Sequence, residues 1–353
     1  MIKTIAHPDA KTRDAIRHLL ADPATAQRAC GEHDPAWLDI LRDGLRHDTA
    51  ALVHRHRGEV TGYLPLSLLR SPLFGRHLVS LPYLNRAGVV ATDDETAARL
   101  IRAAADLADQ RRARYLELRH HGQSISHDLL EHTRDAKVRM VLPLPEDPDA
   151  LWTSLKAKVR NQVRKGEKHE LSIRFGGAEL IDSFYSVFAT TMRDLGTPVY
   201  PKRLFGSILH YLGNSAELAL VTMEGATIAG ALLVHSDTAE RRETQVPSAC
   251  CLHQFHPTSA NMWMYRQLLD RAIQRGSSVF DFGRSSVDSG TYRFKQQWGA
   301  QPHATPWQVY LRTGELDAAR PDHPANQRKV RAWKKLPVWT TRLIGPAIVR
   351  GIP

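Results

Sequence analysis

Apolar and polar positions in the first half of the chain alternate between helical and strand spacing. Apolar residues recur every three or four positions over 11–21 and 35–46, which predicts two helices. Thr92 and Glu95 fit a capping box, so a third helix is expected from Thr92 to about Arg111. Short β-rich runs predict strands at 49–54, 60–69, 77–84, 114–119 and 137–144.

The second half repeats this order after a stretch rich in Pro and acidic residues, 143–148. Asp147 and Pro148 are typical of the first positions of a helix, which we expect over 148–165. Helices are also expected at 181–192 and 260–274, and strands at 171–175, 218–223, 228–235, 242–249, 278–283 and 303–312. The pattern predicts two similar α+β domains, 1–146 and 147–319, and a tail, 320–353.

Composition narrows the functional class. The chain has 353 residues, 42% hydrophobic and 24% charged, which is typical of a folded protein and excludes a disordered or polytopic membrane protein. The N-terminus has no apolar segment of a signal peptide, so we expect a cytoplasmic protein. Three Cys residues give no disulfide framework, and His253 and His256 alone are too few for a metal site.

The net charge of +11 is concentrated in two segments, 154–168 and 320–353. In the first, Lys156, Arg160 and Arg164 recur every fourth residue with no acidic residue between Asp149 and Glu167. Like charges at this spacing repel. Two interpretations stay open: a solvated helix face, or a surface that binds an anionic partner.

Several motifs resemble those of FemAB-type transferases. The string Lys158-Val159-Arg160-Asn161-Gln162-Val163-Arg164-Lys165 resembles the K-x-R-N-x-x-R-K helix of that family. The segments 81–85, 193–200, 280–285 and 290–300 resemble motifs of the branch found beside exosortase/PEP-CTERM and exopolysaccharide genes. The resemblance implies two tandem GNAT-like (acyl-CoA N-acyltransferase-like) domains with mixed sheets.

The resemblance also implies an activity: an N-acyl or aminoacyl transferase that forms an amide on an amine of a cell-envelope or exopolysaccharide precursor. Its donor would be aminoacyl-tRNA. Acyl-CoA, which BioF2-like and GNAT proteins use, is the alternative, although 253–259 holds no Gly-rich pyrophosphate loop. A non-catalytic scaffold of an export system is a third hypothesis. None of these three hypotheses requires a metal or a permanently bound cofactor.

Candidate site residues come from the same motifs. By resemblance, Lys295 stabilises charge at the reacting carbonyl, Phe294 contacts the donor, and Trp298 stacks on a base. Asp281 and Arg284 follow a predicted strand, where sites of mixed sheets often lie. Weaker candidates are Glu243 as a base or amine anchor, and Asp194 and Tyr200 in a loop that would line the acceptor pocket.

The tail combines a basic cluster containing Trp333 and Trp339 with an apolar stretch, 343–353, that Gly and Pro interrupt. It is too short to span a bilayer. One hypothesis is an interfacial anchor, in which 328–353 contacts an anionic membrane and holds the enzyme at the inner face of the cytoplasmic membrane. The other is a tail that packs across the two domains and buries Trp333, Trp339 and Ile348.

Overall fold

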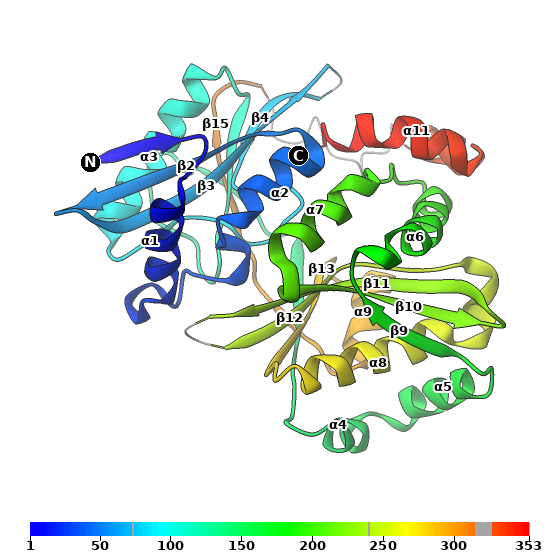
Figure 1. The fold of residues 1–353 in the computed structure, drawn as a ribbon. Coiled ribbons are helices and arrows are strands. Elements are labelled where there is room, and N and C mark those ends of the chain that lie inside the picture. Colours follow the sequence, from blue (N-terminus) through cyan, green and yellow to red (C-terminus); the bar gives the residue numbers. More distant parts are fainter. Residues whose placement is uncertain (73, 239–240, 315–326, 353) are drawn as a thin grey trace.

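Two mixed β-sheets, each flanked by helices, form the body of the protein (Figure 1). The computed structural model describes residues 1–72, 74–238, 241–314 and 327–352. The first sheet has the order β1-β2-β3-β4-β6-β15-β7, with β5 paired to β3. Its strands are β1 (Ile2–Ile5), β2 (Asp48–His56), β3 (Glu59–Ser71), β4 (Gly75–Val79), β5 (Val90–Ala91), β6 (Tyr115–Arg119), β7 (His132–Arg134) and β15 (Trp307–Leu311).

The second sheet has the order β14-β8-β13-β12-β11-β10-β9. Its strands are β8 (Lys137–Pro143), β9 (Ser172–Gly176), β10 (Ala216–Met223), β11 (Ala226–Asp237), β12 (Arg242–Cys251), β13 (Val279–Ser286) and β14 (Gln301–His303). The boundary expected at residue 146 does not divide the sheets, because β8 joins the second sheet and β15 joins the first. A Pro-rich turn marks a change of direction in the chain, but it does not determine which sheet the flanking strands join.

The helices largely follow the apolar periodicity. They are α1 (Ala10–Ala21), α2 (Ala36–Leu45), α3 (Asp94–Gln110), α4 (Pro148–Ser154), α5 (Ala157–Glu167), α6 (Ile181–Leu195), α7 (Lys202–Leu212), α8 (Ala260–Gln274), α9 (Gly290–Gln297), α10 (Gln327–Lys334) and α11 (Val338–Val349). Short 3-10 turns lie at Pro23–Thr25, Gly31–His33, Ala178–Leu180, Gly213–Ser215 and His253–Thr258.

Two helices differ from the prediction. Asp93, not Thr92, caps α3, because its carboxylate accepts a hydrogen bond from the backbone N–H of Thr96 at 2.7 Å. The helix expected over 148–165 is two helices, since Leu155 has extended backbone (ψ 143°) between α4 and α5. Asp147 caps α4 as expected, through its carboxylate.

A shared apolar core joins the two halves. Trp37 and Leu41 of α2 belong to the same buried cluster as Phe184 of α6 and Phe205 of α7. The helices α2 and α7 come so close that a Cβ on Gly44 would lie 3.0 Å from the Cα of Leu204. This packing holds the two sheets in a fixed relation, and the polar site described next lies at their seam.

Candidate active site

A cavity of about 340 Å³ opens where the pairing of β12 and β13 ends. These strands are parallel and pair over three residues only, from Glu243 opposite Val279 to Gln245 opposite Asp281. Pro247 follows in β12 and has no N–H with which to continue the ladder. The residues beyond the last pair line the cavity from both strands: Val246, Pro247 and Ala249 of β12, and Phe282, Gly283 and Arg284 of β13.

The first half of the chain supplies the opposite wall of this cavity. Glu32 and the segment 83–85 line it. The segment is held in an unusual conformation, since Leu81 and Tyr83 have φ of 55° and 70°, a region that costs non-glycine residues energy. Such strain persists where surrounding contacts impose it, and the Tyr83 hydroxyl donates to the carbonyl oxygen of Val349 at 2.8 Å. The shape of this wall therefore depends on contacts between distant parts of the chain, including α11.

Lys295 enters the cavity from α9. Ser289 caps this helix by accepting from the N–H of Tyr292, and the helix turns Lys295 inward, where 9% of the residue is exposed. Its ammonium donates to the carbonyl oxygens of Gly283 and Arg284, both at 3.1 Å. Burial lowers the pKa of Lys295 to about 8, against the opposing effect of Asp281. At neutral pH the group is a cation with one more N–H than these two bonds use.

Arg284 is a second cation on the same wall and is half-buried. Its guanidinium lies 3.6 Å from the ring centroid of Trp307, and that of Arg119 lies 3.7 Å from the same ring. Burial, with a further contribution from Arg119, lowers the pKa of Arg284 to about 10. Its Nε is buried and has no hydrogen-bond partner among the described residues. Both cations would be stabilised by an anion in the cavity.

Two buried carboxyl groups face these cations. Asp281 accepts a hydrogen bond from the N–H of Gly283 at 2.8 Å, and Glu32 accepts one from that of Asn85 at 3.2 Å. Burial raises the pKa of each carboxyl group, although neighbouring arginines oppose the shift. A carboxyl group with a raised pKa is suited to proton transfer near neutral pH. The cavity thus combines proton acceptors with groups that stabilise negative charge.

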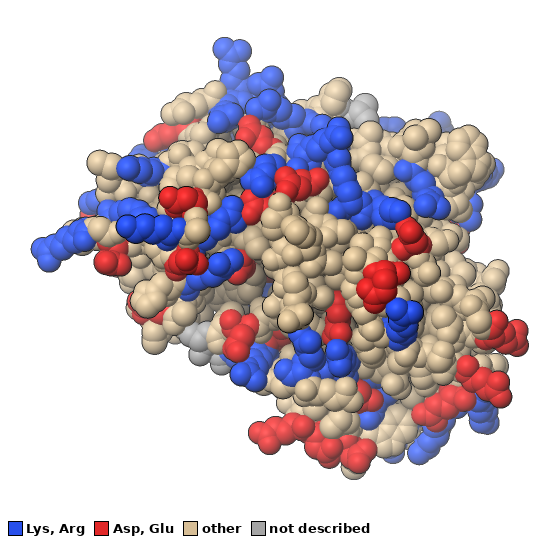
Figure 2. Space-filling model, viewed as in Figure 1, with Lys and Arg blue, Asp and Glu red and all other residues tan. Residues whose placement is uncertain are grey.

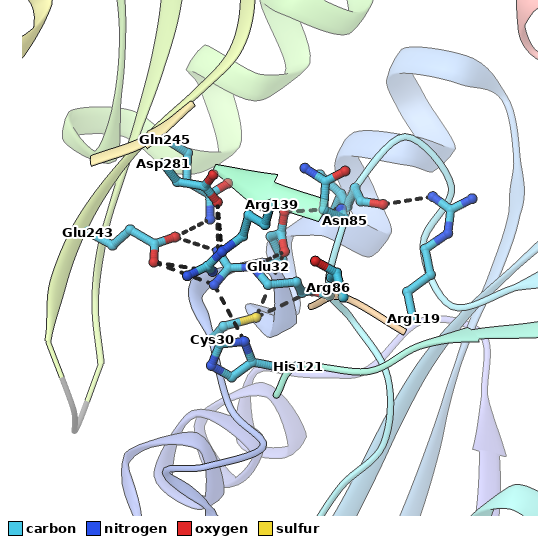
Figure 3. A network of polar contacts seen from close by, with 12 residues as sticks. Cys30, Glu32, Asn85, Arg86, Arg119, His121, Arg139, Glu243, Gln245 and Asp281 are labelled. Carbon is cyan, nitrogen blue, oxygen red and sulfur yellow. Dashed lines mark hydrogen bonds and ion pairs between the residues drawn. The ribbon is translucent and has the colours of Figure 1, made fainter. Parts of the chain in front are cut away.

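Behind the cavity, Arg86 organises a network of buried ion pairs between the two halves (Figure 3). Its Nε donates to Glu32 at 3.0 Å, and its Nη2 donates to Glu243 and lies 3.6 Å from Asp281. Arg139 adds looser pairs, 3.6 Å to Glu243 and 3.7 Å to Asp281. All five side chains are at most 5% exposed, so water compensates their charges little. Arg241, which is 30% exposed, adds a further loose pair to Glu243 at 3.8 Å.

This network corrects the role expected for Glu243. Burial alone would raise the pKa of this carboxyl group, but Arg86 and Arg139 lower it to about 2. A carboxylate so strongly stabilised by cations is a poor proton acceptor. Glu243 therefore holds Arg86 and accepts from the Gln245 amide at 2.8 Å, and Asp281 is the better candidate for the base.

A larger cavity of about 640 Å³ lies on the other side of the network. Its polar and charged lining is formed by Gln27, Arg28, Arg86, Asp94, His120, His121, Gln123, Ser124, Ser126, Arg139, Arg241, His303 and Thr305. His120 is 2% exposed, and neither ring nitrogen has a hydrogen-bond partner among the described residues. Burial lowers the pKa of His120 to about 3, so its ring is neutral. The cavity suits a polar ligand.

Three of the residues predicted from sequence, Lys295, Asp281 and Arg284, come together in the smaller cavity. Phe294 is half-buried, and its ring packs edge-on against Tyr265 with centroids 4.9 Å apart. Trp298 corrects the prediction, since it is 2% exposed within the core and cannot stack on a base. Trp298 packs inward because it lies on the buried face of the turn after α9.

The loop 193–200 does not line either cavity. Asp194 pairs with Arg193 at 2.6 Å, on the surface. Tyr200 packs edge-on against Tyr83, with ring centroids 5.4 Å apart, and thus supports a cavity residue from behind. The expected contact of Asp194 and Tyr200 with an acceptor is therefore replaced by a supporting role for Tyr200.

The basic residues of α5 and its N-cap, Lys156, belong to a helix at the lower edge of the second half in Figure 1. Lys156, Arg160 and Arg164 line none of the cavities described above. Arg160 has a structural contact, because its guanidinium donates to the carbonyl oxygens of Thr153, at 3.2 Å, and Leu155 at the end of α4. Arg164 lies 5.5 Å from the Trp152 ring. These residues form a separate basic surface.

No prediction from the sequence included Glu32, Arg86 or Arg139 as site residues. Arg139 had one signal, an arginine inside the apolar run 138–142, where a buried charge requires a partner. Glu32 lies in a short 3-10 turn and Arg86 in an irregular segment, and neither segment has a periodicity that indicates burial. The described residues contain no cluster of three or more His, Cys, Asp or Glu suited to a metal ion.

Comparisons with known proteins agree with this architecture. Residues 153–296 match the family described as "Acetyltransferase (GNAT) domain". No curated protein matches by sequence. Among solved structures, the crystal structure of FemX matches with a TM-score of 0.64 and 15% identity, covering 94% of this chain and 100% of that chain.

Two further structures match over most of their length. L-PGS from Bacillus licheniformis matches with a TM-score of 0.57 and 13% identity, covering 94% of this chain and 99% of that chain. A tandem GNAT protein from the clavulanic acid biosynthesis pathway matches with a TM-score of 0.55 and 14% identity, covering 90% and 100%. The α+β architecture predicted from the sequence is confirmed: the chain has the fold of tandem GNAT proteins, and its second half matches the GNAT acetyltransferase domain.

Proposed function

We propose that the protein is an N-acyl or aminoacyl transferase that forms an amide on an amine of a cell-envelope or exopolysaccharide precursor. The observation that carries this proposal is the cavity at the end of the β12–β13 pairing, with buried Lys295 and half-buried Arg284 beside Asp281. The match of residues 153–296 to a GNAT domain supports transfer of an acyl group. The motifs of 158–165 and 290–300 support a FemAB-like reaction within that class.

The chemistry follows from the cavity's groups. The neutral acceptor amine attacks the carbonyl carbon of an activated ester or thioester, and a C–N bond forms. The third N–H of Lys295 stabilises the tetrahedral oxyanion. Asp281 accepts the proton that the amine loses and returns it to the leaving oxygen or sulfur as the C–O or C–S bond to the donor breaks. No covalent enzyme intermediate is needed.

The donor is proposed to be anionic, either aminoacyl-tRNA or acyl-CoA. Arg284 offers a half-buried cation near the reacting end, and α5 offers a separate basic surface. The larger cavity, with its many hydrogen-bonding side chains, is suited to the polar body of the acceptor. The similarity in fold to FemX favours the aminoacyl donor as the first to test.

The test offers the purified chain two donors, a mixture of charged tRNAs or a set of acyl-CoA thioesters, with a precursor pool extracted from envelope material. Mass spectrometry follows the mass added to an amine-bearing acceptor. Transfer that ribonuclease abolishes identifies the tRNA donor, whereas resistant transfer with a thioester identifies acyl-CoA. The Asp281→Asn variant is the inactive control. Absence of transfer from every donor would favour the scaffold hypothesis.

The α5 surface leads to a separate prediction. Reversal of two exposed charges, Lys156→Glu with Arg164→Glu, is expected to weaken donor binding by about 1–3 kcal/mol, as for charge-assisted contacts, without unfolding the protein. Binding should also weaken as salt is raised. Fluorescence anisotropy with a labelled donor measures both, and Arg102→Glu on α3 is the control. Affinity that is independent of salt would contradict an anion-binding role.

A further inference from the structure

The C-terminal helix α11 packs on the body through one face only. Thr341, Gly345 and Val349 recur every fourth residue and are buried. A Cβ on Gly345 would lie 2.9 Å from the backbone nitrogen of Val199, so the helix backbone touches the body directly. The opposite face carries Trp339 and Leu343, which are 70% and 73% exposed.

Contacts at both ends fix this helix across the two halves (Figure 1). Before α11, Arg193 of α6 donates to the carbonyl oxygen of Leu336 at 3.1 Å. At its end, Tyr83 donates to Val349, and a Cβ on Gly351 would lie 2.6 Å or less from the Ser71 side chain. The tail thus packs across the body, as one sequence hypothesis expected. Of the three side chains that this hypothesis buries, Trp333 and Ile348 are half-buried and Trp339 is exposed. Because α11 is held at both ends and still exposes Trp and Leu side chains, we expect this face to bind a partner.

The charged residues of the described tail all have the same sign. The described segment 327–352 contains no acidic residue and seven basic ones, Arg328, Lys329, Arg331, Lys334, Lys335, Arg342 and Arg350. Burial lowers the pKa of Arg203, and the nearby charges of Arg46 and Arg350 lower it further. The basic surface therefore extends to the start of α7. In Figure 2, Lys and Arg side chains gather over the junction of α2, α7 and α11.

We propose that the exposed face of α11 docks on an anionic membrane surface. Trp339, Leu343 and Ile344, which is 39% exposed, enter the boundary between headgroups and acyl chains, and the surrounding Lys and Arg side chains contact lipid phosphates. A protein partner of mixed charge would be matched by acidic as well as basic residues, and 327–352 has none. No described helix is both long and apolar enough to cross the bilayer, so the association is peripheral.

The experiment is co-sedimentation of the full chain with two kinds of vesicle, phosphatidylcholine alone and phosphatidylcholine mixed with phosphatidylglycerol. We expect the chain to pellet with the mixed vesicles and high salt to release it. The double variant Trp339→Ser, Leu343→Ser is expected to lower vesicle affinity at least tenfold. Val287→Ser removes another exposed apolar side chain, 53% exposed on the turn before α9, and should bind as the unmodified protein does.

Charge reversal tests the electrostatic part independently. Lys334→Glu with Lys335→Glu is expected to lower affinity at least tenfold for the mixed vesicles, whereas Lys11→Glu with Arg102→Glu should change it little.

Equal sedimentation with both vesicle types, or variants that all sediment like the unmodified protein, would overturn the proposal. So would a dimer, detected by analytical ultracentrifugation, that Trp339→Ser dissociates, because α11 would then bind a second copy. Transferase activity plays no part in these readouts.

Discussion

Replacing Lys295 with alanine is expected to lower the rate of acyl transfer by ~10²–10³, the usual effect of losing one oxyanion donor. Donor affinity should change little, because the third N–H is used fully only when charge develops on the carbonyl oxygen. Single-turnover kinetics separates the two quantities. Gln296→Ala, an exposed neighbour on the same helix, is the matched control. An alanine variant that reacts as fast as the unmodified enzyme would show that Lys295 is only structural.

The pH dependence gives a second readout of the same group. Burial lowers the pKa of Lys295 to about 8, so the ammonium is lost as the pH rises through that value. The rate is therefore expected to decline on the alkaline side of pH 8. Lys295→Arg keeps a cation to much higher pH, so its lower rate should lack this decline, although its planar fork fits the site poorly. The same alkaline decline in the arginine variant would assign it to another group.

Lys295 should also lower the stability of the fold. Its pKa falls from 10.5 to about 8 on folding, so the unfolded state binds more protons between these values and stability rises with pH through that range. At pH 7 the ammonium is almost fully charged in both states, so nearly the whole free-energy cost of burying it is present. Lys295→Met removes it, but leaves the two carbonyl oxygens unpaired. We expect a net gain of about 1–2 kcal/mol in the free energy of unfolding. Urea denaturation measures it, and a loss would contradict this argument.

The sequence predicted the part of the site that is local in the chain. Asp281, Arg284 and Lys295 lie within one strand, turn and helix, so a motif and its secondary structure suffice to bring them together. Helix 260–274 was predicted with its observed bounds because its periodicity and its flanking residues agree. Where an element is defined by nearby residues, the pattern of the chain contains the necessary information.

The remainder of the site depends on contacts between distant segments. Arg86 and Glu243 are 157 positions apart, and neither position reveals that the other compensates its charge. For that reason the sequence suggested Glu243 as a base or an amine anchor, whereas in the structure its carboxylate is paired with Arg86. The exchange of β8 and β15 between the sheets is equally non-local. Pairing of strands from different halves has no signal in the periodicity of either strand.

Arg86 is expected to be the residue whose loss most destabilises the protein. Arg86→Met would remove the 3.0 Å ion pair of buried Glu32. Buried Glu243 and Asp281 would keep only looser pairs, to Arg139 at 3.6 and 3.7 Å and, for Glu243, to Arg241 at 3.8 Å. Breaking a buried ion pair by removing one partner typically costs about 3–5 kcal/mol, because the remaining charges stay buried without compensation. We expect a loss of this size in the free energy of unfolding at pH 7.5, measured by urea denaturation.

The pH dependence of that loss identifies its electrostatic origin. Without Arg86, the carboxyl groups relieve their repulsion by binding protons, so their pKa values rise in the folded variant. The folded variant then binds protons at a higher pH than its unfolded chain, and the loss should shrink as the pH falls from 7.5 to 5.5. Arg99→Met removes an exposed pair with Glu95 and should cost under about 0.5 kcal/mol at both pH values. A loss for Arg86→Met that is equal at both pH values would instead indicate a packing defect, and the network would then not be held by its charges.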